Sequence, residues 1–191
     1  MAKNYNNLSI SCISSIEQKA LRCLFVSKDA FIITTDFGFN MLSLNGQVKQ
    51  TLNFPESEGK VSGLEIMNHF IVSWTQESYI RIFSISHEIK QIGQSRRFED
   101  SRALIGQIRN CSINSTGKKI GIISNKVSSS GSSVNHSFHI YDTDVDSFTD
   151  YNLGDEHIPI AINWDKKEMR YFGVLAETSK QEKQVEETKG D

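Results

Sequence analysis

The residues from Gln107 to Asn152 decide the fold, because they contain four short apolar segments separated by turns. The first two segments are Gln107-Ile-Arg-Asn-Cys-Ser-Ile-Asn114 and Lys118-Lys-Ile-Gly-Ile-Ile-Ser124, and the last two are Ser137-Phe-His-Ile-Tyr-Asp142 and Ser147-Phe-Thr-Asp-Tyr-Asn152. Short runs of β-branched and aromatic residues bounded by turn residues are typical of antiparallel strands. The segment therefore predicts a four-stranded meander, which forms one blade of a β-propeller when it is repeated around an axis.

The same spacing recurs along the chain. Equivalent first strands begin near Leu21, Val61, Gln107 and Ile158, at separations of 40, 46 and 51 residues. WD40-type blades span roughly 40–45 residues, with insertions in loops. The pattern predicts an all-β, WD40-like β-propeller fragment of about three and a half four-stranded blades. Because closed propellers typically have about four to eight blades, we expect a fragment of a longer protein or a ring that another chain completes.

Strand and turn signals also divide the chain into segments. The predicted segments are an N-terminal segment that could lend a strand to a neighbouring blade (1–20), a blade (21–54), a blade plus connector (55–103), a blade with a Ser-rich loop at 125–136 (104–154), a half blade (155–176) and a charged disordered tail (177–191). The charged connector from Ser95 to Ala103 could hold a helical turn. Asn45-Gly46 predicts a type I′ hairpin, because both residues tolerate positive φ.

Composition excludes several classes of protein. The net charge of −2 gives no general attraction to nucleic acid or anionic membranes. No apolar signal core or membrane-length apolar run occurs, so we expect a soluble cytosolic protein. Cys12, Cys23 and Cys111 form no CxxC pair, which favours buried free thiols.

Two stretches resemble a known family. Ile113 to Ile123 resembles the WD40 turn between the first and second strands, with Gly117 as its left-handed residue, and Tyr141-Asp142 stands where a Trp-Asp dipeptide ends the third strand. Ser137 to Phe148, followed by Pro159 and Asn163-Trp-Asp-Lys-Lys-Glu-Met-Arg-Tyr171, resembles the N-terminal propeller of the 140-kilodalton subunit of intraflagellar transport complex A. The resemblance covers roughly residues 59–176.

The resemblance implies a non-catalytic scaffold that binds other subunits of intraflagellar transport complex A. It implies roles in retrograde ciliary transport and in the entry of membrane cargo into cilia, and a location in the cytoplasm, the cilium or flagellum and the basal body. No cofactor, metal, nucleic acid, small-molecule substrate or direct membrane insertion is expected. The alternatives are a WD40 subunit of another trafficking or regulatory complex, or a hydrolase in which Asp36, Asp142 and Asp165 meet at the axis.

Three groups of residues could carry chemistry. Asp142, Asp144 and Asp146 match the opening of a calcium-binding EF-hand loop, but Ser147 and Leu153 stand where that loop needs Gly and Glu, so we expect a hairpin turn with solvated carboxylates. His136 and His139 would point to opposite faces of a strand and cannot share a metal, which favours surface or edge histidines. Cys111 lies within a strand, which favours core packing over nucleophilic chemistry.

The remaining conspicuous residues are expected to be structural. Trp74 and Trp164 end apolar strands and should pack in the core or between blades, with an exposed partner contact as the alternative. Ser95-Arg-Arg97 with Arg102 forms a small basic cluster, which we expect to be a solvated loop. The alternative is a contact with an acidic partner or a phosphoinositide. The predicted blade-structural residues are Gly46, Trp74, Gly117, Tyr141, Asp142 and Trp164.

Overall fold

The computed structural model describes residues 23–27, 30–97, 106–127, 134–151, 153–154, 156–168 and 170–178. The expected strand within 1–20, Cys12, Arg102, the centre of the Ser-rich loop and residues 179–191 of the expected tail lie outside these ranges. Within them, the chain is a β-propeller fragment made of β-strands and one short 3₁₀ turn. No helix in the described ranges has the length and apolar character needed to cross a membrane.

Three four-stranded antiparallel sheets and one two-stranded sheet follow one another along the chain. Sheet 1 contains β1 (Cys23–Ser27), β2 (Ala30–Thr35), β3 (Gly38–Ser43) and β4 (Val48–Asn53). Sheet 2 contains β5 (Val61–Met67), β6 (Phe70–Thr75), β7 (Tyr79–Ile85) and β8 (Ile89–Arg97). Sheet 3 contains β9 (Gln107–Ile113), β10 (Lys119–Val127), β11 (Val134–Asp142) and β12 (Ser147–Tyr151). The half sheet contains β13 (His157–Trp164) and β14 (Phe172–Thr178).

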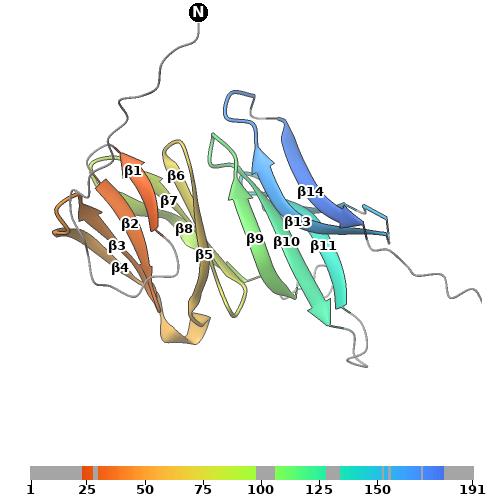
Figure 1. The fold of residues 1–191 in the computed structure, drawn as a ribbon, viewed down its shortest axis with the longest axis horizontal. Helices are drawn as coiled ribbons and strands as arrows, with labels where there is room; N and C mark the ends of the chain where they lie inside the picture. Colours follow the sequence, from red (N-terminus) through yellow and green to blue (C-terminus); the bar gives the residue numbers. More distant parts are fainter. Residues whose placement is uncertain are drawn as a thin grey trace, which may run out of the picture.

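Each sheet is a meander, in which every strand pairs with the strands before and after it in the sequence. Figure 1 shows the sheets side by side in sequence order, from sheet 1 on the left to the half sheet on the right. The first strands β5, β9 and β13 of successive sheets contact one another. This arrangement is that of consecutive propeller blades, with the first strand of each blade innermost.

The structure corrects three expected boundaries. Ser95 to Arg97 are not part of a helical turn, because β8 continues to Arg97 and pairs there with Tyr79 of β7. The ladder of β10 and β11 extends to the pair of Val127 and Val134, so the ends of the expected loop at 125–136 are strand. Two residues of the expected tail, 177 and 178, belong to β14 because they pair with β13.

The hairpin between β3 and β4 forms where Asn45-Gly46 predicts one, but its turn type differs. The Gly46 N–H donates to the Ser43 carbonyl, and the Ser43 N–H donates to the Gln47 carbonyl (both 2.9 Å). Gly46 has a φ of +83°, whereas Asn45 is not among the residues with positive φ. A type I turn followed by a left-handed glycine therefore connects the strands, and the expected type I′ turn is wrong.

Two apolar clusters bury the facing sides of the sheets. One joins sheet 1 to sheet 2 and includes Phe39, Phe54 and Phe83, whose rings lie 5.1–5.9 Å apart. The other joins sheet 2, sheet 3 and the half sheet. Polar side chains add to the first contact, since the Gln50 amide exchanges two hydrogen bonds of 2.8 Å with the backbone of Ile89. Each sheet is therefore stabilised by burial against its neighbours.

Gly63 marks a close approach of the backbone to a buried side chain in the second cluster. A Cβ atom at this position would lie 2.0 Å from Cζ2 of Trp74, so the bare glycine backbone forms the wall against which the indole packs. Trp74 is 1% exposed. The site therefore tolerates no side chain unless the indole moves.

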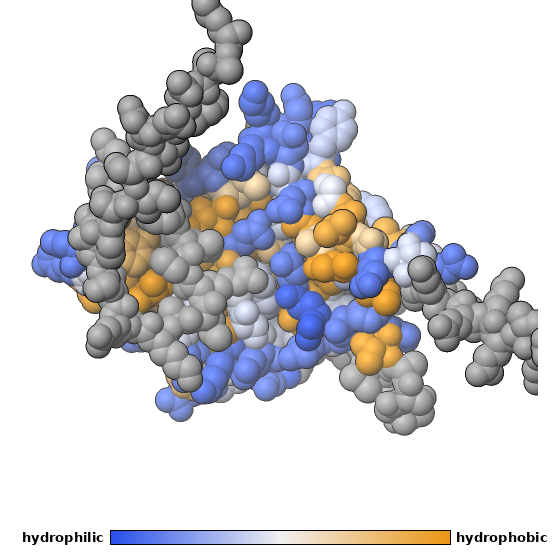
Figure 2. Space-filling view, viewed as in Figure 1, coloured by the Kyte–Doolittle hydropathy of each residue, from blue (hydrophilic) through white to orange (hydrophobic). Residues whose placement is uncertain are grey.

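The half sheet leaves large apolar side chains exposed. Its buried side presents Ile162 and Trp164 to sheet 3, whereas Leu175 is 63% exposed and Ile160 is 48% exposed. Figure 2 shows apolar surface over the region of β13 and β14 in this view. Antiparallel sheets commonly leave one face uncovered, so apolar side chains that are exposed in this way are ordinary for such a sheet.

Candidate interaction surfaces

The inner strands of three successive sheets are joined by a short polar chain. The hydroxyl of Ser112 in β9 donates to Oε1 of Glu65 in β5 at 2.9 Å, and the indole Nε1–H of Trp164 in β13 donates to the Ser112 carbonyl at 3.0 Å. Ser112 is fully buried and Trp164 is 5% exposed. Ser112 thus connects sheet 2 to the half sheet through sheet 3, and it fixes how the three first strands lie together.

We expect the Trp164→Phe substitution to lower the free energy of unfolding by about 1–3 kcal/mol, because it leaves the buried Ser112 carbonyl without this donor. Phe keeps an aromatic ring against Phe172, whose centroid lies 5.1 Å from that of the indole. Urea denaturation of the two proteins measures the difference. Tyr171→Phe is the control, since Tyr171 is 67% exposed; a loss no larger than that of the control would contradict the assignment.

The connector from sheet 1 to sheet 2 is held by a buried ion pair. Glu58 lies in the 3₁₀ turn η1 (Glu56–Glu58), and its carboxylate accepts two hydrogen bonds from Arg81 of β7, at 2.6 and 3.0 Å. Ser95 of β8 donates a third at 2.9 Å, and the Arg81 guanidinium lies 4.9 Å from the centre of the Phe54 ring. The side chains of Glu58 and Arg81 are 8% and 11% exposed. A bidentate pair with further donors satisfies both buried charges.

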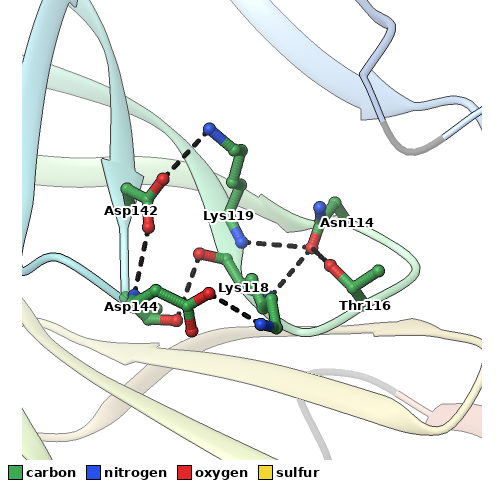
Figure 3. Close-up of polar contacts among 7 residues, drawn as sticks. Asn114, Thr116, Lys118, Lys119, Asp142 and Asp144 are labelled. Carbon is green, nitrogen blue, oxygen red and sulfur yellow. Dashed lines mark hydrogen bonds and ion pairs between the residues drawn. The ribbon is translucent and has the colours of Figure 1, made fainter.

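Charged and polar side chains gather on the turns at one end of sheet 3, and Figure 3 shows how they meet. Lys118 pairs with Asp144 at 2.7 Å, and Lys119 pairs with Asp142 at 3.0 Å. We name these four charged residues the rim cluster. The hydrogen bond from Lys119 lowers the pKa of Asp142, so this carboxylate stays ionised, and the pair intact, to lower pH than usual. The exposed pairs contribute little to stability but give the rim a fixed pattern of charge.

Asn114 organises the turn beneath the rim cluster. Its Oδ1 accepts hydrogen bonds from the backbone N–H groups of Lys118 and Lys119 and from the Thr116 hydroxyl, at 3.0–3.1 Å. The residue is 2% exposed. Gly117 follows with a φ of +75°, and a Cβ there would lie 2.5 Å from the ring of Phe70 in sheet 2. The turn therefore serves as a packing contact between two sheets.

The aspartates after β11 act as ion-pair partners and turn caps. Asp146 accepts a 2.7 Å hydrogen bond from the Tyr141 hydroxyl and pairs at 2.5 Å with Arg96 of sheet 2. Asp142 accepts from the Asp144 backbone N–H at 3.0 Å. Among the described residues, no group of three or more His, Cys, Asp or Glu side chains could hold a metal ion. The three aspartates thus belong to a hairpin turn, where they pair with basic side chains of sheets 2 and 3.

Arg96 and Arg97 of the basic cluster also interact with other residues of the chain. Arg96 binds Asp146, and Arg97 donates to the Glu77 carbonyl at 3.1 Å while its guanidinium lies 5.4 Å from the centre of the Tyr79 ring. Both arginines belong to β8 rather than to a solvated loop. Such paired arginines hold strands together and leave less charge for an outside anion.

Ser124, His139 and Asp150 form a line of hydrogen bonds across β10, β11 and β12 that resembles a catalytic triad. His139 Nε2 lies 3.2 Å from the Ser124 hydroxyl, and His139 Nδ1 lies 2.6 Å from an Asp150 carboxylate oxygen. The line is exposed at the opposite end from that of a hydrolytic site, because Ser124 is fully buried whereas the Asp150 side chain is 63% exposed. A nucleophile must reach its substrate, so this line satisfies a buried histidine. The expectation of a surface or edge His139 is wrong.

Cys111 lies in the second apolar cluster and is fully buried. Burial, and next the negative charge of Glu65, raises the pKa of its thiol well above the ordinary value. The thiolate is the reactive form of cysteine. The position therefore disfavours both nucleophilic chemistry and oxidation.

We expect Cys111 to resist alkylation by iodoacetamide at pH 8 in the folded protein and to react fully in urea. The reason is that burial removes access and disfavours the thiolate. Mass spectrometry of the peptide that carries Cys111 measures the modified fraction in the two conditions. Equal rates with and without urea would show that this part of the sheet opens readily.

The residues predicted to be structural lie on turns and in cores. Gly46 lies in the β3–β4 turn, Gly117 in the β9–β10 turn and Asp142 at the end of β11. Trp74, Tyr141 and Trp164 are 1–5% exposed. Sequence patterns did not indicate Glu58, Arg81 or Ser112, because an isolated charge or serine carries no signal of its distant partner.

Comparison with known proteins identifies the family. A family model described as the IFT140 second β-propeller matches residues 4–157. The chain belongs to the IFT140 second β-propeller family. The resemblance to the 140-kilodalton subunit is thus confirmed, but the expectation of its N-terminal propeller is wrong, because the match is to the second. A comparison with curated proteins found no match.

Solved structures share the fold of this IFT140-family chain. The crystal structure of the tricorn protease matches with a TM-score of 0.53 and 16% identity, over 83% of this chain and 15% of that one. A chain in the S. cerevisiae complex of Dbp5 with Nup159, Gle1, IP6 and ADP matches with a TM-score of 0.52 and 13% identity, over 71% of this chain and 37% of that one. The chain thus spans well under half of these two proteins, and the likeness concerns the fold alone.

Proposed function

We propose that this chain is a non-catalytic WD40 scaffold that takes part in protein–protein interactions within intraflagellar transport complex A. The observation that carries the proposal is the match to the IFT140 second β-propeller over residues 4–157. Its partners are other subunits of that complex, and its roles are retrograde ciliary transport and the entry of membrane cargo into cilia. It acts in the cytoplasm, the cilium or flagellum and the basal body, without cofactor, nucleic acid, membrane insertion or small-molecule substrate.

The geometry of the described residues supports a scaffold. The hydroxyl of the triad-like line is buried, and the Cys111 thiol is buried as well. The charged rim cluster and the outer strands remain accessible while the sheets are stabilised behind them. Rigid sheets that present loops and edges suit docking, which needs no titratable site.

The hydrolase alternative gains no support from the carboxylates that suggested it. Asp36 pairs with Lys60 at 2.9 Å, and Asp142 pairs with Lys119. Asp165 accepts backbone N–H groups of Lys167 and Glu168 at 2.7 Å, which lowers its pKa. Each carboxylate thus caps a turn or neutralises a nearby lysine in its own sheet or connector.

Affinity purification from ciliated cells tests the scaffold role. We expect the tagged chain to recover subunits of intraflagellar transport complex A in preference to vesicle-coat subunits, as measured by quantitative mass spectrometry. The Arg81→Met variant, which should disturb the join of sheets 1 and 2, controls for recovery that does not depend on the fold. Enrichment of vesicle-coat subunits alone would favour another trafficking complex and refute the proposal.

A further inference from the structure

The outer strands β4, β8 and β12 each pair on one side only within the described sheets. The ladder of β4 breaks beside Leu42, and the ladder of β8 breaks between Ile80 and Ile82. The ladder of β12 with β11 has no irregularity from the pair of Asp142 and Ser147 to the pair of Phe138 and Tyr151. Bulges make an edge strand unsuitable for pairing with a further strand. The regular edge is therefore that of β12.

A cavity of about 670 Å³ opens at the end of this edge, between β11, β12 and the start of β13. Its apolar lining includes Phe138, Leu153 and Pro159, and Tyr151 adds a ring that is 44% exposed. The ring of Tyr151 lies 5.3 Å from that of Phe138. A cavity of this size can take an apolar side chain with room for adjoining backbone.

Asp150 and Tyr151 give the two faces of the edge strand different chemical groups. Successive residues of a strand point to opposite sides, so the carboxylate lies on one face and the phenol ring on the other. Asp150 uses one oxygen to accept the His139 Nδ1–H and is otherwise exposed. It is the one carboxylate among the described residues that line the cavity, and no Lys or Arg is among them.

We propose that the β12 edge takes an extended segment of a partner protein as a fifth strand, with a basic residue opposite Asp150 and an adjacent apolar residue beside Tyr151 in the cavity. Strand addition supplies backbone hydrogen bonds, and alternating side chains supply selectivity. Opposite charges directly across a strand pair attract, and like charges repel. The inference rests on the proposed scaffold function and names the class of partner segment for this edge.

Charge also separates this partner from a second copy of the chain. A second copy that paired through its own β12 would add a second Asp150 carboxylate to the same edge. A segment that alternates basic and apolar residues meets no such repulsion. The edge therefore selects a different chain.

Fluorescence anisotropy with three end-blocked, fluorescein-labelled peptides tests the proposal on the full chain. The first alternates Arg and Val, the second alternates Glu and Val, and the third is the first with alternate backbone amides N-methylated. We expect the first to bind and the other two to bind at least tenfold more weakly. The Asp150→Asn variant should weaken the first peptide about two- to fivefold, because a cross-strand ion pair of up to about 1 kcal/mol is lost.

Asp150→Asn keeps an oxygen that accepts the His139 Nδ1–H, so the sheet should remain folded, which a circular dichroism melt checks. Asp144→Asn is the matched control, since Asp144 is an exposed carboxylate of the same sheet away from the cavity. Equal binding of the first and third peptides, or equal loss in both variants, would overturn the proposal. A dimer in light scattering that the first peptide dissociates would assign the edge to a second copy instead.

The two proposals fail separately. Recovery of transport subunits from cells without any preference among the peptides would refute the strand-addition site alone. Peptide preference without recovery of transport subunits would refute the scaffold role within that complex.

Discussion

The Arg81→Met substitution should lower the free energy of unfolding by about 3–5 kcal/mol, because it leaves the buried Glu58 carboxylate without its bidentate partner. Among the described residues, Ser95 alone would remain as a side-chain donor to that carboxylate. Met keeps most of the aliphatic volume beside Phe54, so lost packing is a minor part of the effect. Chemical denaturation followed by circular dichroism measures the change.

The double variant Glu58→Gln/Arg81→Met separates charge from packing. Removing both charges leaves a neutral amide that Ser95 can still contact, so the double variant should be more stable than Arg81→Met alone. Lys90→Met is the control, since Lys90 pairs with Glu88 on the surface and its side chain is 66% exposed. If Arg81→Met and Lys90→Met lose similar stability, the buried pair does not hold the connector.

The Gly63→Ala substitution should cost about 3 kcal/mol, because the added methyl would overlap the Trp74 indole. The indole lies in the core with the buried side chains of Val72 and Ile80, so it has little room to move. A fall in the urea midpoint with an unchanged m-value would show lost stability without a change in the surface exposed on unfolding.

A smaller side chain at position 74 should relieve this overlap. Trp74→Leu alone leaves a cavity, but Gly63→Ala adds a methyl to that space, so the double variant should lose less than the sum of the two single variants. Gly173→Ala is the matched control, because a Cβ there meets nothing within 4 Å. Strict additivity of Gly63→Ala and Trp74→Leu would argue against the close contact.

The sequence predicted the strands well because their signals are local. Apolar runs such as Ile120 to Ile123, bounded by Gly and Asn turns, depend on neighbouring residues alone. The prediction of a type I′ turn at Asn45-Gly46 was wrong because two turn types accept the same dipeptide. The added residue in the loop decides between them. The end of β8 was missed because its last residues, Gln94 to Arg97, carry no apolar alternation.

The candidate surfaces were harder to predict because their contacts are remote in sequence. Ser112 binds a residue 47 positions earlier and another 52 positions later. His139 was expected at the surface because a lone histidine gives no sign of the partners that bury it. The regular edge of β12 depends on the pairing register, which a single sequence does not state.

The order of the sheets decides which sheets lose stability when one of them is mutated. The largest contacts between sheets join consecutive neighbours, with β5 against β9 and β9 against β13. Such an array behaves as a row of coupled units, in which each unit stabilises the next. A destabilising substitution in sheet 1 should therefore accelerate amide hydrogen exchange mainly in sheets 1 and 2. The position of the substituted sheet along the array would decide which other sheets are destabilised.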